Sequence, residues 1–593
     1  MLLFMLHLMP HTPVHTSTRV STLLAILIIL AGVTTSFFAF HQKSSTVDES
    51  VHEAAGYSYW ATRDFGLNPE HPPLLKEIAA LPLLFLHLES KADSAFFSQQ
   101  NLWSFGPLFI FENTVDAETI QYAGRTSVLI FFVLLGVLTY RWARELFGEK
   151  IALVVLTFTM FSPNLLAHSP LITTDVAMTF AVLFASYTAT QWLKHSSRKN
   201  FWWFTFALLV MFLTKFSALV VAPIFFVVLA VHSLLHTKRS QKKQWLAVVH
   251  DFFSEKFWPY MGALLLVVAG IMLFYSFDFQ TLATSIDAKM FFETLAKSLP
   301  GPLQSFVLWF ITHVPFPIFH FTEGAIMVIT HNQGGHDSFL LGQTGNHGWW
   351  YYFPVLFFLK SSLVELFLVF GTVTVVLFSF LRPLILAKSA RVSALLARLR
   401  TTPFDYFVLL LIPLLFFAMS MRSNLNLGLR HVLLVYPFVF LLSGIFLHEL
   451  WKTVAGRVVV CVALIFSLAI ALLSFPNYLS YFNPLLGGNT NARNIAVDSN
   501  VDWGQDLKAL AKYLKDRDIH RVYLAYFGTS RPSYYGISYD SVPTFEQIKE
   551  NGPIHGTVVV SATLLAHPNP DIAWVLTKKP DTILNGSLYI FTF

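Results

Sequence analysis

Three carboxylates stand directly beside apolar sequence and are the candidate catalytic groups. Asp48 and Glu49 follow the apolar stretch 21–40, and Asp175 lies near the start of another one, LITTDVAMTF. Carboxylates that converge from separate segments can share proton abstraction and the electrostatic work of a reaction. The alternatives are idle, solvated carboxylates for the first pair and a favourable place on a helix dipole for Asp175. Convergence of the three in one cavity would favour catalysis.

Basic side chains at comparable positions are candidate partners of an anionic group. His71 and Lys76 lie in EHPPLLK, Lys215 lies in FLTKFSAL, and Arg430 and His431 lie in NLGLRHVLLVYP. A guanidinium can bind phosphate through two N–H groups, and an ammonium binds it as a point charge. The alternative for the long side chains is snorkelling from apolar surroundings to water. Their shared position at the ends of apolar runs predicts a site for the phosphate of a lipid.

Glu70 and a histidine-rich segment form the candidate metal site. His331, His336 and His347 lie in THNQGGHDSFLLGQTGNHGWW, and two histidines with a carboxylate can bind a divalent cation. The spacing matches no closed zinc motif, and idle loop histidines are the alternative in a chain that has 22 of them. We expect a divalent cation only as an optional cofactor, with Glu70, His331 and His336 as its ligands.

Membrane helices must position these residues. The chain has 593 residues, of which 55% are hydrophobic and 12% charged, and its mean hydropathy is +0.57. A soluble domain is about 25% charged. Apolar runs of ~20 residues match the hydrocarbon thickness of a bilayer, and the sequence predicts a polytopic α-helical membrane protein with about eleven transmembrane helices. The predicted runs lie near 19–40, 126–140, 151–168, 175–193, 201–214, 217–235, 258–277, 351–381, 404–421, 431–448 and 457–475.

Composition excludes several other classes of protein. The single cysteine, Cys461, excludes a disulfide framework within the chain. The net charge of +6 comes from short loops between apolar runs, so it does not indicate nucleic acid as a partner. The sequence contains no P-loop and no GxGxxG, so a nucleotide is not expected either. The first apolar run lacks a small-residue cleavage site and is interpreted as a signal anchor.

Charge in the loops predicts the orientation. Lys and Arg concentrate in alternate connections, and the positive-inside rule places these in the cytoplasm; they are 141–150, 193–200, 236–244, 382–400 and 452–457. The N-terminus is then cytoplasmic, and the loop 41–125, the loop 279–350 and the tail 476–593 are extracytoplasmic. We expect an integral protein of the bacterial inner (plasma) membrane. The candidate residues above then lie at its extracytoplasmic face.

The sequence divides into a transmembrane module, 1–475, and an extracytoplasmic α/β domain, 476–593. In the first outer loop, HPPLLKEIAALPLLFL (71–86) is too short to span and is expected at the membrane interface. In the tail, 498–516 predicts an amphipathic helix with Asp502 as its N-cap. Leu507, Leu510 and Leu514 share one face of that helix. RVYLAYFG, TVVVSATLL and SLYIFTF are typical of strands.

Several blocks resemble a known family. They occur in the family's order and are NPEHPPLLK, TTD, LTKFSAL, HGWWYYFPVLFFLK, NLGLRHVLLVYPF and DSNVDWGQDLKAL. The chain resembles the phospholipid-carrier-dependent glycosyltransferases of the GT-C superfamily and is similar to protein O-mannosyltransferases and the lipid A aminoarabinose transferase. The resemblance implies a GT-C-like fold, with Asp48, beside Glu49, as the catalytic base or as the carboxylate that orients the acceptor, and with Asp175 as the second acidic residue. It also implies that Glu70 and His71 lie near the donor phosphate or a metal.

The resemblance implies a nucleotide-independent glycosyltransferase. It would transfer a sugar from a polyprenyl-phosphate-linked donor in the lipid bilayer to an extracytoplasmic acceptor, which could be a protein, a glycan or a lipid. We expect one inverting displacement, with Lys76, Lys215 and Arg430 stabilising the leaving phosphate. The alternatives are a transporter or flippase of lipid-linked sugars and a scaffold whose outer domain binds partners. Transporters commonly contain two related halves, which this sequence lacks.

Overall fold

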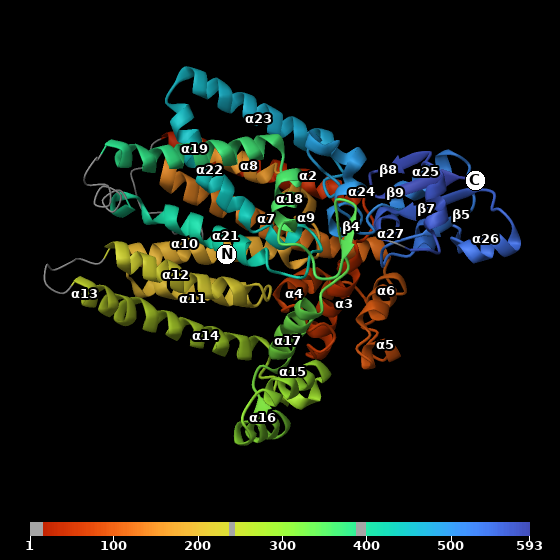
Figure 1. Cartoon of the computed structure of the whole chain (residues 1–593), viewed down its shortest axis with the longest axis horizontal. Coiled ribbons are helices and arrows are strands. Elements are labelled where there is room, and N and C mark those ends of the chain that lie inside the picture. Colours follow the sequence, from red (N-terminus) through yellow and green to blue (C-terminus); the bar gives the residue numbers. More distant parts are fainter. Residues whose placement is uncertain (1–15, 237–243, 387–398, 568) are drawn as a thin grey trace.

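The structure is a computed structural model that describes residues 16–236, 244–386, 399–567 and 569–593. A bundle of long helices forms the larger part, and a small sheet lies beyond one end of it (Figure 1). Six helices in the described residues are long and apolar enough to cross a membrane; they are α2 (Thr16–His41), α7 (Ala117–Phe147), α10 (Thr174–Lys194), α12 (Ala218–His236), α14 (Trp258–Phe274, within the apolar stretch Val248–Phe274) and α23 (Val454–Ser474). The chain is an integral membrane protein, as predicted.

The expected count of about eleven crossings is not confirmed. A seventh span exists in the described residues if α18 (Tyr352–Lys360) and α19 (Leu363–Leu386) count as one, although the chain bends by 114° between them. Four other predicted runs do form helices, namely α8 (Glu149–Met160), α11 (Arg198–Phe212), α21 (Phe404–Ser420) and α22 (Val435–Trp451). These have 12, 15, 17 and 17 residues. A straight crossing needs about 20 residues, so their length alone does not establish them as spans.

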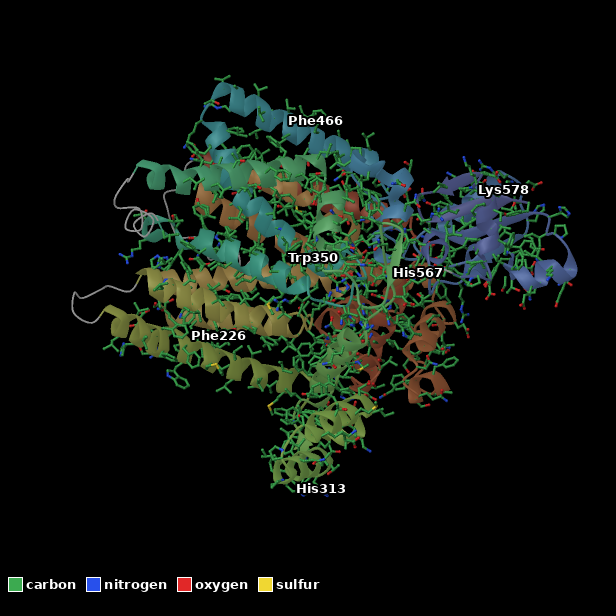
Figure 2. The ribbon with its side chains drawn as sticks, viewed as in Figure 1. Phe226, His313, Trp350, Phe466, His567 and Lys578 are labelled. Atoms are coloured by element: carbon green, nitrogen blue, oxygen red, sulfur yellow. The ribbon has the colours of Figure 1, made fainter. Side chains whose placement is uncertain are left out.

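Burial separates the central helices from those that face lipid. In α10, 94% of the apolar window is buried inside the protein, whereas in α23 the share is 28%. A helix that is apolar all round and enclosed belongs to the core, and an exposed apolar face requires lipid. Phe466 on α23 is 59% exposed and lies along the outer edge of the bundle (Figure 2). The helix that carries Asp175 is therefore central.

Shorter elements cover one end of the bundle, here called the α3 end. They include α3 (Val47–Thr62), α4 (Leu74–Ala80), η1 (Leu81–Phe85) and α6 (Leu102–Phe111). The predicted interfacial helix 71–86 is broken, because α4 gives way to the 3-10 turn η1, which has a proline in its first turn. Leu75 and Ala79 of α4 are buried, whereas Phe85 is 82% exposed. Only the distal end of this segment thus offers apolar surface.

The predicted long loop, 279–350, contains two parts. Helices α15 (Ile286–Lys297) and α16 (Gly301–His313) form a hairpin that projects from the bundle, closed at its base by β1 (Gln280–Thr281) and β2 (Pro315–Phe316) (Figure 1). After α17 (Phe319–Gly334), β3 (Ser338–Leu340) and β4 (Gln343–Gly345) form a small ribbon. The ring of Phe339 lies 6.4 Å from that of His567, which Figure 2 labels. The ribbon therefore contacts the C-terminal region.

The C-terminal region contains a five-stranded mixed sheet in the order β6-β5-β7-β9-β8. Strand β5 is parallel to β6 and β7, and β9 is antiparallel to β7 and β8. The strands are β5 (Val522–Ala525), β6 (Tyr539–Ser541), β7 (Thr557–Ser561), β8 (Thr582–Leu584) and β9 (Leu588–Thr592). Each of the three predicted strand segments contains one of them, β5, β7 or β9, so the small α/β sheet region is confirmed.

The predicted helix 498–516 is shorter than expected. Helix α25 (Leu507–Asp516) starts after Asp506, and Leu507, Leu510 and Leu514 are buried on one face as predicted. Asp502 is not its N-cap, because Gly504 has φ +87° and turns the chain between the two. The Asp502 carboxylate instead accepts the backbone N–H of Thr563 at 3.1 Å.

The segment 476–506 joins the bundle to the sheet. It packs onto the α3 end, where Lys43 Nζ lies 2.7 Å from Asp506 Oδ1. The backbone N–H of Asn483 donates to the carbonyl of Leu359 at 2.8 Å. Helix α23 ends at Ser474, but the segment beyond it contacts both bodies. The division into 1–475 and 476–593 therefore stays a prediction.

Candidate active site

The guanidinium of Arg430 links two carboxylates at the α3 end. Its Nη1 lies 3.1 Å from Asp48 Oδ2 and 3.7 Å from Asp175 Oδ2. The other oxygen of Asp175, Oδ1, lies 2.6 Å from Lys215 Nζ. Two carboxylates and two cations from four separate segments thus share one cluster. These four residues are called the Asp48 cluster below.

Helix ends bring the Asp48 cluster together. Asp48 lies in the first turn of α3 and Asp175 in the first turn of α10. The N-terminal end of a helix favours a carboxylate, since its free N–H groups carry partial positive charge. Lys215 lies in the break between α11 and α12, and Arg430 lies in the 3-10 turn η4 (Leu429–Val432) before α22. The chain therefore places each charge where the backbone leaves or enters a helix.

The four side chains of the Asp48 cluster differ in their exposure to solvent. The side chain of Asp175 is 0% exposed and that of Arg430 is 10% exposed, whereas those of Asp48 and Lys215 are each 17% exposed. Burial disfavours the charge on Arg430, but Asp48 and Asp175 outweigh it and hold the pKa of Arg430 above its ordinary value. Asp175 is the buried anchor, while Asp48 and Lys215 can be reached by a ligand.

Two histidines with lowered pKa values lie near the cations of the Asp48 cluster. Burial, together with the nearby cations Lys215 and Arg430, holds the pKa values of His71 and His431 well below the ordinary value. The ring of His71 lies 4.9 Å from that of His52, whose Nδ1 is 2.7 Å from the carbonyl of Ile172. An uncharged imidazole can donate or accept a hydrogen bond. His71 and His431 thus lie within electrostatic reach of the predicted phosphate site.

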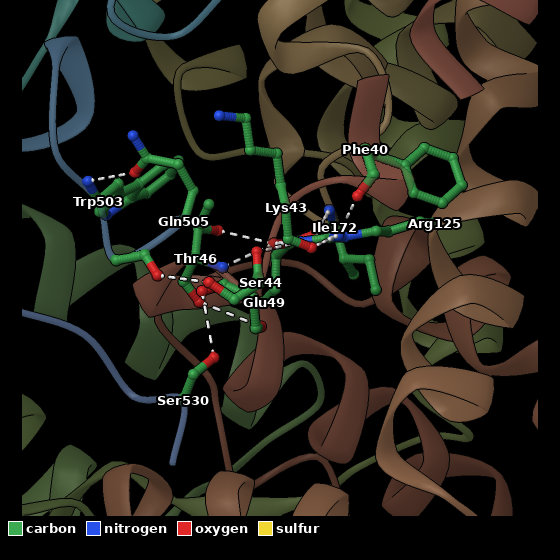
Figure 3. A network of polar contacts seen from close by, with 12 residues as sticks. Phe40, Lys43, Ser44, Thr46, Glu49, Arg125, Ile172, Trp503, Gln505 and Ser530 are labelled. Carbon is green, nitrogen blue, oxygen red and sulfur yellow. Dashed lines mark hydrogen bonds and ion pairs between the residues drawn. The ribbon is translucent and has the colours of Figure 1, made fainter. Parts of the chain in front are cut away.

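Glu49 points into a different network from its neighbour Asp48. Its carboxylate accepts from Nε and Nη2 of Arg125 at 2.7 and 2.6 Å and from the backbone N–H of Ile172 at 3.2 Å (Figure 3). The backbone N–H and hydroxyl of Thr46 donate to it at 2.8 and 3.0 Å. Burial opposes ionisation, but Arg125 and these hydrogen bonds hold the pKa of Glu49 below its ordinary value. Glu49 is therefore bound to the scaffold, and the structure does not bring it into the Asp48 cluster.

Lys76 is also withdrawn from the predicted phosphate site. Its Nζ donates to the hydroxyl of Tyr59 at 2.8 Å and to the carbonyls of Asn68 and His71 at 2.6 and 2.7 Å. The residue is 0% exposed. An ammonium has three N–H groups, and all three are used here. The expectation that Lys76 binds the donor phosphate is corrected: it fixes the turn that presents Glu70 and His71.

The candidate metal ligands meet only in part. His331 Nδ1 lies 2.9 Å from Glu70 Oε1. The ring of His336 lies 5.6 Å from that of His331, and its Nδ1 lies 3.0 Å from the carbonyl of Asp337. Across the described ranges, the structure holds no group of three or more His, Cys, Asp or Glu side chains arranged to bind a metal ion. The three residues do not fit the divalent cation that the sequence allowed.

Residues 119–254 match the family model of the dolichyl-phosphate-mannose-protein mannosyltransferases. The predicted resemblance to the GT-C glycosyltransferases is confirmed. The matched GT-C segment includes Asp175 and Lys215, whereas Asp48 and Arg430 lie outside it. The Asp48 cluster therefore combines residues of the matched segment with residues from both sides of it.

Solved structures of GT-C glycosyltransferases resemble the whole chain at low identity. One is ArnT from Cupriavidus metallidurans bound to undecaprenyl phosphate, with 11% identity, a TM-score of 0.44, and coverage of 95% of this chain and 97% of that chain. Another is the archaeal oligosaccharyltransferase AglB from Archaeoglobus fulgidus in complex with an inhibitory peptide and a dolichol-phosphate. Its identity is 13%, its TM-score 0.42, and the coverage is 91% of this chain and 69% of that chain. No curated protein sequence matches the chain significantly.

Two residues that contact Arg430 were not identified from the sequence alone. Its guanidinium carbon lies 4.2 Å from the centre of the Trp503 ring, and its Nε donates to Ser499 Oγ at 3.2 Å. Both come from the segment between α23 and the sheet. The block DSNVDWGQDLKAL, which contributed to the family resemblance, contains them. That block is the sequence signal for these two residues, but its amphipathic leucines favour the interpretation of the whole block as a helix.

Proposed function

We propose that the chain transfers a sugar from a polyprenyl-phosphate-linked donor to an extracytoplasmic acceptor. The observation that carries this proposal is the Asp48 cluster, in which an accessible carboxylate lies 3.1 Å from a guanidinium at the end of a membrane bundle. The match of residues 119–254 to a family that uses a lipid-phosphate-linked sugar supports it. A base next to a phosphate-binding cation is the pair of groups that such a transfer needs.

The chemistry is a single displacement. Asp48 takes the proton of an acceptor hydroxyl or amine as the acceptor atom bonds to the anomeric carbon. The bond from that carbon to the phosphate oxygen breaks, and the polyprenyl phosphate leaves with the electron pair. Lys215 and Arg430 stabilise the charge on this leaving group. One displacement inverts the anomeric carbon and needs no covalent intermediate.

Asp175 acts through the two cations in this scheme. Its side chain is 0% exposed, and its two oxygens lie toward Lys215 and Arg430 at 2.6 and 3.7 Å. A buried carboxylate so placed fixes the spacing between an ammonium and a guanidinium. It keeps both cations near the leaving phosphate and leaves Asp48 as the accessible base.

The direct test is release of polyprenyl phosphate by purified protein, in lipid nanodiscs, from a polyprenyl-phosphate-linked sugar with no nucleotide present. We expect release by the wild-type protein and its loss in Asp48→Asn. Asp93→Asn, an exposed carboxylate of the same loop, is the matched control and keeps activity. A flippase would move the donor across a vesicle membrane without cleaving it, and that result would overturn the proposal.

The acceptor can be found in cells. Mass spectrometry of cell-envelope glycans, lipids and proteins from strains with wild-type protein and with Asp48→Asn should differ in one modification. Immunoblotting checks that the two proteins are equally abundant. An unchanged envelope at equal abundance would contradict the assignment of Asp48 as the base.

A further inference from the structure

The segment 499–507, here called the C-terminal strap, contacts the cationic side of the Asp48 cluster. Ser499 Oγ accepts from Arg430 Nε at 3.2 Å, and the Trp503 ring lies against the same guanidinium at 4.2 Å. Trp503 is itself 2% exposed and packs with the apolar side chains of Leu171 and Leu479. The ring that meets the guanidinium is therefore held firmly.

The same strap holds the start of the helix that carries Asp48. The carbonyl of Trp503 accepts the backbone N–H of Val47 at 3.0 Å. The backbone N–H of Ser44 donates to the carbonyl of Gln505 at 2.9 Å, and its hydroxyl donates to that of Gly504 at 2.9 Å. Figure 3 shows Trp503 and Gln505 beside Ser44 and Thr46. One segment thus fixes both members of the Asp48–Arg430 pair.

Gly504 ties the strap to the sheet. The hydroxyl of Tyr526, directly after β5, donates to the carbonyl of Gly504 at 2.6 Å. Gly504 has φ +87°, and a Cβ there would lie 2.7 Å from that hydroxyl and 2.9 Å from the carbonyl of Phe527. Only glycine fits this turn without strain. The position of the strap is therefore set by the C-terminal sheet.

An aromatic face suits a guanidinium that must also bind a ligand. The ring attracts the cation through its face and uses none of the N–H groups. Those groups stay available for Asp48, Ser499 and an incoming phosphate. A long flexible Arg side chain held in this way loses less freedom when the phosphate binds.

We propose that Trp503 is a positioning residue that holds the Arg430 guanidinium toward Asp48, so that the C-terminal domain completes the transfer centre. This inference rests on the proposed function. It gives the domain a role in binding the phosphate of the donor, separate from any recognition of the acceptor.

A comparison of variants tests the proposal with polyprenyl phosphate as the binding probe and the lipid-linked sugar as substrate. We expect Trp503→Leu to weaken binding of polyprenyl phosphate and to raise KM by roughly tenfold, with a smaller change in kcat. Trp503→Phe keeps an aromatic face and should restore most of the binding. Trp574→Leu, a half-buried tryptophan of the same domain, is the matched control and should leave binding unchanged.

A double-mutant cycle separates positioning from a general loss of structure. If Trp503 acts through Arg430, Trp503→Leu should weaken binding of polyprenyl phosphate much less in an Arg430→Gln background than in the wild-type protein, because the effects of coupled residues are not additive. Thermal unfolding checks that each variant is folded. If Trp503→Leu does not fold, the same cycle can be measured with Trp503→Met, which fills more of the space but has no aromatic face, and with Ser499→Ala. Additive effects would overturn the positioning role.

The outcomes distinguish the two proposals. Binding of polyprenyl phosphate that depends on Trp503, in a protein that transfers no sugar, would support the positioning role and contradict the proposed function. Sugar transfer and binding that are indifferent to Trp503→Leu would leave the function standing and overturn the positioning role. A wild-type protein that binds no polyprenyl phosphate would overturn both.

Discussion

Asp48 and Glu49 are neighbours in α3, and each faces an arginine, but the two pairs differ in every other respect. The Glu49 and Arg125 side chains are each 1% exposed, and Glu49 accepts hydrogen bonds from Arg125, Thr46 and Ile172. Asp48 and Arg430 are 17% and 10% exposed, and one contact at 3.1 Å joins them. A saturated pair has no capacity left for a ligand. Saturation of the hydrogen bonds and burial together, rather than charge, therefore separate the scaffold pair from the candidate catalytic pair.

Helix geometry explains the divergence. Successive residues of an α-helix point about 100° apart, so neighbours in the first turn face different surroundings. Glu49 turns toward α7, where Arg125 lies, and back to Thr46 in a capping box. Asp48 turns toward η4 and Arg430. One helix start therefore serves both stability and the candidate site.

The largest effect should come from removing the accessible base. We expect Asp48→Asn to lower the rate of sugar transfer by about 10²–10⁴-fold, because a general base of this kind contributes that much. The unfolding temperature should stay close to that of the wild-type protein, since Asp48 makes few contacts. Single-turnover kinetics and thermal unfolding measure the two quantities. Near-normal sugar transfer by this variant would contradict the assignment of Asp48–Arg430 as the catalytic pair and Glu49–Arg125 as the scaffold pair.

Glu49→Gln should show the opposite pattern. Removing one partner leaves the Arg125 charge buried without its counter-ion, so we expect the free energy of unfolding to fall by about 3–5 kcal/mol. The activity of each folded molecule should change much less than in Asp48→Asn. Thermal unfolding and activity normalised to folded protein provide the measurements. The double variant Glu49→Leu with Arg125→Met should recover part of the stability; a further loss would argue against this explanation.

Lys215 and Lys76 show the same contrast between a candidate ligand-binding residue and a scaffold residue, with smaller expected effects. We expect Lys215→Met to raise KM for the lipid-linked donor by roughly 10-fold, because an accessible cation near the phosphate is lost. Lys76→Met should instead lower stability, since it leaves the carbonyls of Asn68 and His71 without their donor. Donor titrations and thermal unfolding distinguish these outcomes. A rise in KM caused by Lys76→Met, without a loss of stability, would instead support a role of Lys76 in binding the phosphate.

The smallest effects should appear as opposite dependences on pH. Burial holds the pKa of His71 well below its unfolded value of 6.5, so its contribution to stability is complete above that value and is lost as the pH falls toward the folded pKa. The hydrogen bond to Glu70 raises the pKa of His331. Its contribution is complete below 6.5 and is lost as the pH rises through the folded pKa.

Thermal unfolding across pH 5–9, roughly the range around an ordinary histidine pKa, measures these contributions. His71→Gln should flatten the acid side of the stability profile, and His331→Gln should flatten the alkaline side. Because His331 and Glu70 are 37% and 36% exposed, solvent screening keeps the second effect small. Equal changes on both sides in either variant would contradict the assignment.

Sequence predicted the helices well because apolar periodicity is a local property. The runs near 19–40, 175–193 and 457–475 coincide with α2, α10 and α23. The number of membrane crossings could not be predicted from the sequence, because tertiary packing decides where a helix breaks. The bend between α18 and α19 falls inside one predicted run, 351–381. The predicted sidedness stays a prediction.

For the candidate site, sequence found charges at helix ends but could not assign their partners. Asp48, Asp175, Lys215 and Arg430 were recognisable because charge is rare beside apolar runs. Glu49 looked equivalent to Asp48, since nothing local indicated that Arg125 of α7 would reach it. The same limit applies to Lys76 and Trp503, whose partners are backbone carbonyls and a guanidinium distant in sequence.

The bend at the end of α18 is linked to the candidate site through hydrogen bonds. Lys360, the last residue of α18, donates to the carbonyls of Leu479, Tyr481 and Asn500. The side chain of Asn500 accepts the backbone N–H of Leu429, directly before Arg430, at 3.0 Å. A change in hydrophobic thickness that alters the bend would therefore pull on the residue next to the guanidinium. If the chain transfers sugar as proposed, its turnover should then vary with bilayer thickness without any lipid-binding pocket.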